Sequence, residues 1–249
     1  MERKIIPETE NRLIILYALR RLGPVTAMQL LQAMAEGDLM NYITMQLSLS
    51  EMESQGQITQ RAHPLGNLIE VTGEGDFILR SFEKRIPASR RAIIDGHAEG
   101  WRSRFATEQM APAEAITLPD GRSVIHLRLL DKAATLMDLL LYLPADKRFT
   151  LLPERWRACV QVAYSTVLAH LTADYSPALP MPDAKETECV RQCGPEEWLL
   201  TLTDEPDTPG IDLIMSLPEE HLARCCALRW PLVAQDIRAF VLHALEDAL

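Results

Sequence analysis

The fold is decided by the stretch from Thr9 to Thr72, which reads TENRLIILYALRRLGPVTAMQLLQAMAEGDLMNYITMQLSLSEMESQGQITQRAHPLGNLIEVT. Its first part predicts an amphipathic helix with Thr9 as the N-cap and Gly23-Pro24 as the stop signal. A second helix follows directly, because Thr26 and Gln29 have the spacing of a capping box. The sequence therefore predicts two helices joined by a short connection.

The rest of the stretch predicts a third helix and a strand pair. Residues 41–55 carry an apolar face, because Met45, Leu49 and Met52 recur at i, i+4 and i+7, which leaves the other face outward. Two strand-like runs, 57–62 and 67–72, flank residues 63–66, whose proline and glycine suit a hairpin loop. Three helices followed by a hairpin are the order of a winged helix-turn-helix, a fold whose commonest use is reading DNA.

Three motifs stand out, which are residues 10–17 (ENRLIILY), 40–44 (MNYIT) and 82–87 (FEKRIP). In these motifs the chain resembles an uncharacterised bacterial winged-helix family, domain of unknown function 4364. The resemblance extends over Asp120-Gly121 and Leu139–Leu143 to about Leu171. It implies a winged-helix domain of a presumed transcriptional regulator, and it implies no ligand or target sequence. The segment after Leu171 lies beyond it.

Length and composition predict a globular protein of one or two domains with a substantial core, since 47% of the 249 residues are hydrophobic. The N-terminus lacks the apolar run of a signal peptide, and no stretch approaches the roughly 18 apolar residues of a membrane span. Five cysteines, an odd number, fit a reducing compartment better than a disulfide framework. We therefore expect a soluble cytoplasmic protein with no membrane partner.

The net charge of −10 disfavours indiscriminate binding of nucleic acid, but the charge is unevenly distributed. Residues 1–104 contain 13 Lys and Arg against 13 Asp and Glu, so the acidity belongs to the C-terminal part. A cationic strip within residues 80–104 consists of Arg80, Lys84, Arg85, Arg90, Arg91, Arg102 and Arg104. This strip can meet phosphates, or it can be the solvated face of a long helix that pairs with a partner helix.

The C-terminal part repeats itself. At a spacing of 73 residues, Gly121, Leu127, Leu129 and Asp131 match Gly194, Leu200, Leu202 and Asp204. Further matches follow at a spacing of 74 residues. They pair Asp138-Leu139 with Asp212-Leu213, Leu143-Pro144 with Leu217-Pro218, Arg155-Trp156 with Arg229-Trp230, Val167-Leu168 with Val241-Leu242, and Leu171 with Leu245. Because two of only four tryptophans fall on equivalent positions, the match indicates an internal duplication.

Each copy is predicted to form strands followed by helix, with Pro231 starting a new helix in the second copy. The expected fold is α+β, with a winged helix-turn-helix (1–73), connecting helices (74–108), a first strand-helix repeat (109–173), a linker (174–183) and a second repeat (184–249). The repeats are expected to pack around an internal two-fold as a pseudo-dimer, unless each builds its own core and the chain forms a homodimer through its connecting helices.

The candidate DNA-binding residues lie on the outward face of the third helix and on the hairpin. They are Asn41, Tyr42, Thr44, Gln46, Leu47, Ser48 and Ser50 on the helix, and Arg61 and His63 on the hairpin. The helix carries no Lys or Arg, and Glu51 and Glu53 would repel phosphate. An alternative is therefore that the helix is a scaffold or a protein-binding surface, and that Arg61 is an ordinary solvated arginine.

No other pattern reaches the specificity of a motif. Cys189, Cys193, His221 and Cys225-Cys226 lack the spacing of a zinc signature, and His126, His170 and His243 are expected to be structural. The sequence has no phosphate-binding glycine loop, no G-x-S-x-G elbow and no H-E-x-x-H pair, and the repeated Asp138 and Asp212 suit strand orientation. We therefore expect double-stranded DNA as the partner of a non-enzymatic transcriptional regulator that has no cofactor or metal, with a protein-interaction module as the alternative.

Overall fold

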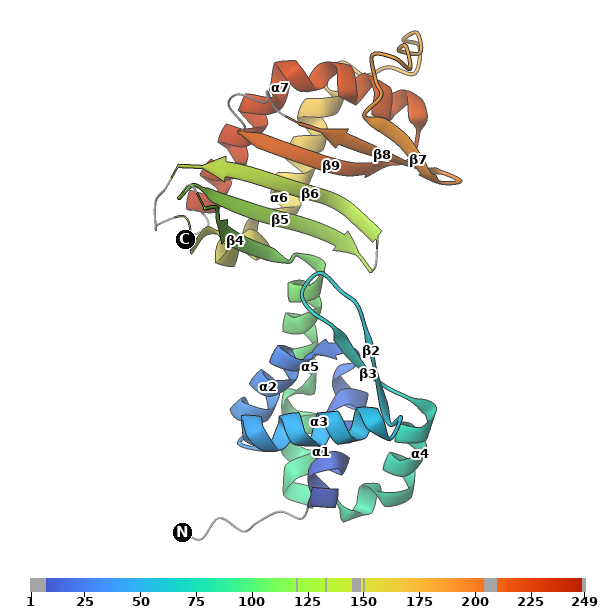
Figure 1. Ribbon diagram of the computed structural model, residues 1–249, viewed down its shortest axis with the longest axis vertical. Coiled ribbons are helices and arrows are strands. Elements are labelled where there is room, and N and C mark those ends of the chain that lie inside the picture. Colours follow the sequence, from blue (N-terminus) through green and yellow to red (C-terminus); the bar gives the residue numbers. More distant parts are fainter. Residues whose placement is uncertain are drawn as a thin grey trace. The chain divides into compact units, whose positions relative to one another are not determined.

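The computed structural model describes residues 8–119, 121–132, 134–144, 149, 151–203 and 210–247. Its first part contains the three helices and the hairpin in the predicted order, together with a two-residue strand, β1, that the sequence did not indicate. The elements are α1 (Glu8–Leu22), β1 (Val25–Thr26), α2 (Ala27–Glu36), α3 (Tyr42–Ser54), β2 (Ile58–Arg61) and β3 (Leu68–Val71). The strands form an antiparallel sheet in the order β1-β3-β2, and α3 lies in front of α1 (Figure 1).

Local signals set the helix boundaries in this part. The capping box is confirmed, because Thr26 Oγ1 accepts a hydrogen bond from the Gln29 N–H and Gln29 Oε1 accepts one from the Thr26 N–H. Gly23 follows α1 with φ +79°, in the left-handed region that favours glycine. The assignment of Thr9 as the N-cap of α1 is wrong, because Thr9 lies inside the helix.

The helices that follow belong to the same core. They are α4 (Gly73–Phe82), a 3₁₀ turn η1 (Glu83–Arg85) and α5 (Ala88–Met110). Leu79, Ile94, Trp101 and Phe105 from these helices are buried in one cluster with the apolar faces of α1, α2 and α3. The chain divides into two compact units, Met1–Gln109 and Met110–Leu249, which we call the N-terminal unit and the C-terminal unit.

The C-terminal unit is a six-stranded antiparallel sheet with two long helices. The elements are β4 (Ala113–Thr117), β5 (Ser123–Asp131), β6 (Ala134–Leu143), α6 (Leu152–Thr172), β7 (Val190–Gly194), β8 (Glu197–Leu202), β9 (Ile211–Leu217) and α7 (Glu220–Asp247). The strand order is β4-β5-β6-β9-β8-β7, and α6 and α7 cover one face (Figure 1). Alternate residues of β6 and β9 are buried, as expected for strands with one covered face. Both repeats contribute to one core, which contradicts a separate core for each.

The two repeats meet around the predicted internal two-fold. In the β6–β9 pair, Leu139 is opposite Leu213, and these two residues are equivalent positions of the repeats. The pair Met137–Met215 becomes Leu141–Ile211 when each residue is replaced by its equivalent 74 positions away. The central strand pairing is therefore two-fold symmetric in its register.

The predicted spacing of 73 residues between equivalent positions of β5 and β8 is wrong. Leu127 pairs with Leu139, and Leu202 pairs with Leu213, so the sheet makes Leu127 equivalent to Leu202 and not to Leu200. A shift of two residues leaves every side chain on the same face, so the apolar alternation did not distinguish the two alignments. The hairpin between β7 and β8 is shorter than the loop between β4 and β5. Asp204, part of the predicted match, lies outside the described residues.

The expectation that Pro231 begins a new helix is also wrong. α7 runs from Glu220 to Asp247 with Pro231 inside it. Proline removes one backbone hydrogen bond and crowds the preceding turn. The helix nevertheless continues, since Ala223, Cys226 and Trp230 before the proline and Val233 and Ile237 after it are buried in the core. None of the described helices is long and apolar enough to cross a membrane.

Candidate nucleic-acid interface

α3 is positioned by its own cap and by a buried inner face. Asn41 Oδ1 accepts a hydrogen bond from the Thr44 N–H, which fixes the start of the helix. Met45 and Met52 are fully buried against the N-terminal core. The opposite face is therefore held toward solvent by a rigid element.

The outward face of α3 is less polar than predicted. Asn41, Tyr42, Leu47 and Ser50 are exposed, and Thr44 and Gln46 are half-buried. The placement of Ser48 on this face is wrong, because its exposed fraction is 3%. The prediction missed Ile43, which is 70% exposed and lies one turn before Leu47, itself 68% exposed. The sequence feature that could have identified Ile43 is its spacing of four residues from Leu47, because this spacing places both side chains on one face of the helix.

The two acidic residues of α3 have polar partners. Arg12 of α1 donates from Nη1 to Glu51 Oε1 over 2.9 Å and to Gln55 Oε1 over 3.1 Å. Glu53 accepts a hydrogen bond from Gln60 Nε2 of β2. Arg12 thus offsets the charge of Glu51, whereas Glu53 remains an exposed carboxylate with a neutral partner.

The hairpin places Arg61 at the end of β2. Its Nε donates to Glu70 Oε1 of β3 over 3.0 Å, with 51% of the Arg61 side chain exposed. His63 is half-buried, and its Nδ1 accepts the Leu65 N–H. Gly66, at φ +117°, adopts a conformation that L side chains rarely adopt and turns the chain back toward β3. Arg61 is therefore the cation of this hairpin, and it already has one carboxylate partner.

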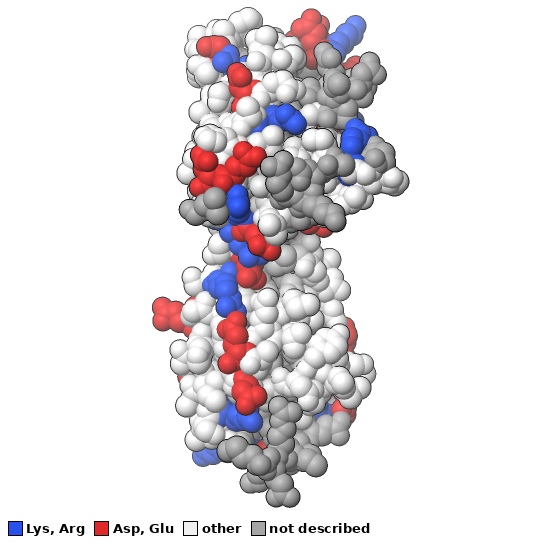
Figure 2. All heavy atoms as spheres, turned by 90° about the vertical axis from the view of Figure 1, so that its left-hand side faces the viewer, with Lys and Arg blue, Asp and Glu red and all other residues white. Residues whose placement is uncertain are grey.

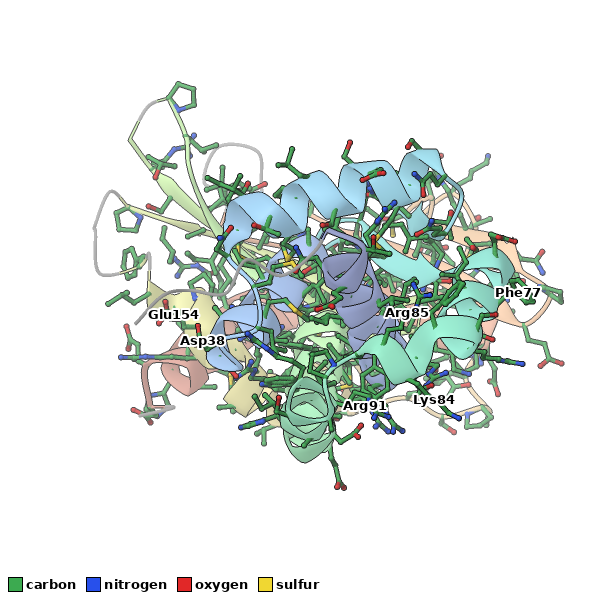
Figure 3. The ribbon with its side chains drawn as sticks, turned by 90° about the horizontal axis from the view of Figure 1, so that it is seen from below. Asp38, Phe77, Lys84, Arg85, Arg91 and Glu154 are labelled. Carbon is green, nitrogen blue, oxygen red and sulfur yellow. The ribbon has the colours of Figure 1, made fainter. Side chains whose placement is uncertain are left out.

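Two residues of the cationic strip lie away from α3, and three of its arginines have acidic neighbours. Lys84 and Arg91 lie on the side of the N-terminal unit opposite α3 (Figure 3). Arg80 pairs with Asp76, Arg91 lies 3.9 Å from Glu83, and Arg104 pairs with Glu36. On the face shown in Figure 2, cationic and acidic side chains are interspersed. Lys84 and Arg91 are therefore not placed to add positive charge beside α3, and the contact of the strip with phosphates stays a prediction.

The remaining candidates of the sequence have structural surroundings. His126 Nε2 lies 2.7 Å from Asp138 Oδ1, and the Tyr142 hydroxyl donates to Asp212 Oδ2 over 2.8 Å. These contacts join neighbouring strands, which is the orienting role expected of the repeated aspartates. Burial and the nearby Asp212 carboxylate raise the pKa of Tyr142. All five cysteines are free thiols, and the described part of the chain places no three His, Cys, Asp or Glu residues together as a metal site.

The N-terminal unit joins the helices α1 to α5 to a small three-stranded sheet, and the C-terminal unit is a duplicated strand-helix sheet. Together they define a two-unit α+β protein. The chain belongs to the family described as domain of unknown function DUF4364, whose model matches residues 11–171. No curated protein and no solved structure matches the chain. The matched segment ends within the last turn of α6, so the second repeat lies outside it.

Proposed function

We propose that the N-terminal unit is a winged helix-turn-helix that binds double-stranded DNA, and that the chain acts in transcriptional control. The observation that carries the proposal is the element order α1-β1-α2-α3-β2-β3 with the sheet order β1-β3-β2. In this arrangement α3 would enter the major groove, and the β2–β3 hairpin would contact the neighbouring backbone or minor groove.

The side chains on α3 suit base reading without strong charge. The Gln46 amide matches the donor and acceptor pair of adenine, and Leu47 suits a thymine methyl group. Tyr42 and Ser50 are exposed hydroxyl groups that can donate to phosphate or to a base edge. Specific hydrogen bonding and apolar contact would then carry a larger share of recognition than counterion release.

Arg61 supplies the phosphate contact in this proposal. Its ion pair with Glu70 lies on the surface, where such pairs contribute about 0 to 1 kcal/mol. A phosphate can therefore compete for the guanidinium. Removing the competing carboxylate would favour that exchange, since it also removes a charge that repels DNA.

The test is a fluorescence anisotropy titration of the full chain with genomic duplex fragments over a series of salt concentrations. Arg61→Ala should weaken binding to many sequences and lower the salt slope by about one, whereas Gln46→Ala should cost about 1 to 3 kcal/mol at one base position. Glu70→Gln should strengthen binding at low salt. Arg80→Ala is the matched control, because it removes an ion-paired arginine from α4 and should leave binding unchanged.

A second candidate function is a protein-interaction module with this fold. The observation that favours it is the exposed pair Ile43 and Leu47 on a helix without Lys or Arg. Apolar side chains at this spacing suit a partner's hydrophobic groove. If the wild-type chain binds no duplex at low salt, DNA binding is excluded and this function takes its place. Salt-dependent binding that Arg61→Ala weakens would decide for DNA.

A further inference from the structure

The contact between the two repeats has the properties of an interface between two copies of one protein. We call the β6–β9 strand pair and the α6–α7 helix contact the seam. Its register is two-fold symmetric about the Leu139–Leu213 pair. An interface between identical subunits is commonly isologous, which means that both subunits use the same surface and that every contact occurs twice. The seam shows this relation within one chain.

Two equivalent arginines each reach the end of the other repeat's helix, and Arg229 also pairs with Asp174. Arg155 of α6 donates from Nη1 to the carbonyl oxygens of Leu245 and Glu246, at the end of α7, over 3.2 and 2.9 Å. Arg229 of α7 donates from Nε to the carbonyl of His170, near the end of α6, over 2.6 Å. The last carbonyls of a helix lack intrahelical partners and carry the negative end of its dipole. Each repeat therefore caps the helix of the other.

Equivalent tryptophans make the same contact inside each repeat. Trp156 Nε1 donates to the Arg128 carbonyl over 2.8 Å, and Trp230 Nε1 donates to the Thr203 carbonyl over 3.0 Å. Arg128 and Thr203 are equivalent in the sheet, because the register aligns Leu127 with Leu202. The repeats thus share their internal packing as well as the surface by which they meet.

A single repeat would leave a large part of this surface uncovered. Leu139 and Leu141 of β6 and Leu213 and Met215 of β9 are fully buried in the shared core. Without the second repeat, β6 would be an open strand of ten residues at the edge of a three-stranded sheet, which is a template for pairing with another strand.

We propose that the seam is a self-association surface whose partner is a second copy of the same strand-helix repeat, and that this chain carries the second copy itself. The family match ends within the first repeat, and only the segment between α6 and β7 links the two. Covalent linkage raises the effective concentration of the second copy, so the seam closes within the chain. The chain is then a monomer with a single N-terminal unit. This inference does not depend on DNA binding.

The test uses the full chain with a protease recognition sequence inserted after Leu179, in the exposed segment between the repeats. Before cleavage, native mass spectrometry should give a monomer, with the 28.1 kDa of the chain plus the mass of the inserted sequence. After cleavage of the folded protein, the two pieces should remain a one-to-one complex at micromolar concentration. An intact chain that is dimeric, or pieces that separate without denaturant, would overturn the proposal.

A second test of the seam's symmetry measures the dissociation constant of the two pieces of the cleaved protein. Arg155→Ala and Arg229→Ala should each raise the dissociation constant of the two pieces by about tenfold, since each removes charged hydrogen bonds to the other repeat. Arg191→Ala, which changes an exposed arginine of β7, is the matched control and should leave the constant unchanged. A loss of affinity in only one of the two variants would contradict the equivalence of the repeats.

Discussion

At the residue scale, Glu36 shows how one carboxylate ties α2 to α5. Its Oε2 accepts the Trp101 indole N–H over 2.6 Å, and its Oε1 accepts from Arg104 Nη2 over 2.9 Å. The Trp101 hydrogen bond, with help from Arg104, lowers the pKa of Glu36. The ionised form is therefore favoured in the folded protein.

This lowered pKa predicts a pH-dependent contribution of Glu36 to stability. The contribution should be present above the ordinary pKa of glutamate and should be lost as the pH falls through the lowered folded value. Glu36→Gln should therefore destabilise the protein more at pH 7 than at about pH 3, which lies below the ordinary pKa of glutamate. Urea unfolding at the two pH values measures the difference, and Glu99→Gln, on an exposed position of α5, is the control. Equal destabilisation at both pH values would contradict this assignment.

The cysteines of the C-terminal unit differ in burial, from which we expect a difference in reactivity. Burial, with a smaller effect of Cys225, raises the pKa of Cys226 to about 12, whereas Cys193 is exposed on β7. Alkylation requires the thiolate and access to it. In native protein at about pH 8, iodoacetamide should modify Cys193 well before Cys226, and urea should remove the difference. Mass spectrometry of the peptides measures both rates, and equal native rates would show that Cys226 is not buried.

At the element scale, the capping box of α2 also anchors the end of α5. Gln29, the third residue of the helix, donates from Nε2 to Glu108 Oε2 and to the Phe105 carbonyl, and it accepts from Gln109 Nε2 at Oε1. The cap residue Thr26 is 5% exposed. Loss of its hydroxyl would leave the Gln29 N–H without its acceptor at a buried helix start.

Thr26→Ala should therefore lower the free energy of unfolding by about 1 kcal/mol. Thr107→Ala is the control, because this exposed threonine of α5 bonds only to the Ser103 carbonyl of its own helix. Chemical denaturation of both variants gives the comparison. A Thr26→Ala variant as stable as the control would show that the cap does not stabilise α2.

The elements also show which signals in the sequence were sufficient. Spacing alone predicted the capping box at Thr26 and the inner face of α3, because both are local rules of the helix. Thr9 failed as an N-cap although its residue type was suitable, since the helix begins at Glu8. Pro231 failed because buried contacts on both sides hold α7 together, and these contacts lie far apart in sequence. Ile43 was missed although it lies four residues before Leu47, which was correctly placed on the exposed face.

At the scale of the whole molecule, self-similarity of the sequence was enough to predict an internal two-fold. It was not enough to place the repeats in one sheet, since pairing of β6 with β9 depends on contacts between the copies. The correct alignment of β5 with β8 required the register of the sheet, because a slip of two residues preserves the apolar face. The sequence predicted that Tyr42, Leu47 and Ser50 are exposed on α3, but it could not show that Lys84 and Arg91 lie on the opposite side of the N-terminal unit (Figure 3).

We propose that this chain binds duplex DNA as a monomer with a single DNA-binding unit. Native mass spectrometry of the full chain with a bound duplex at low salt tests both parts of the claim. We predict one chain per duplex site, with a protein mass of 28.1 kDa in the complex. A complex containing two chains would contradict the single head, and the absence of any complex would contradict DNA binding.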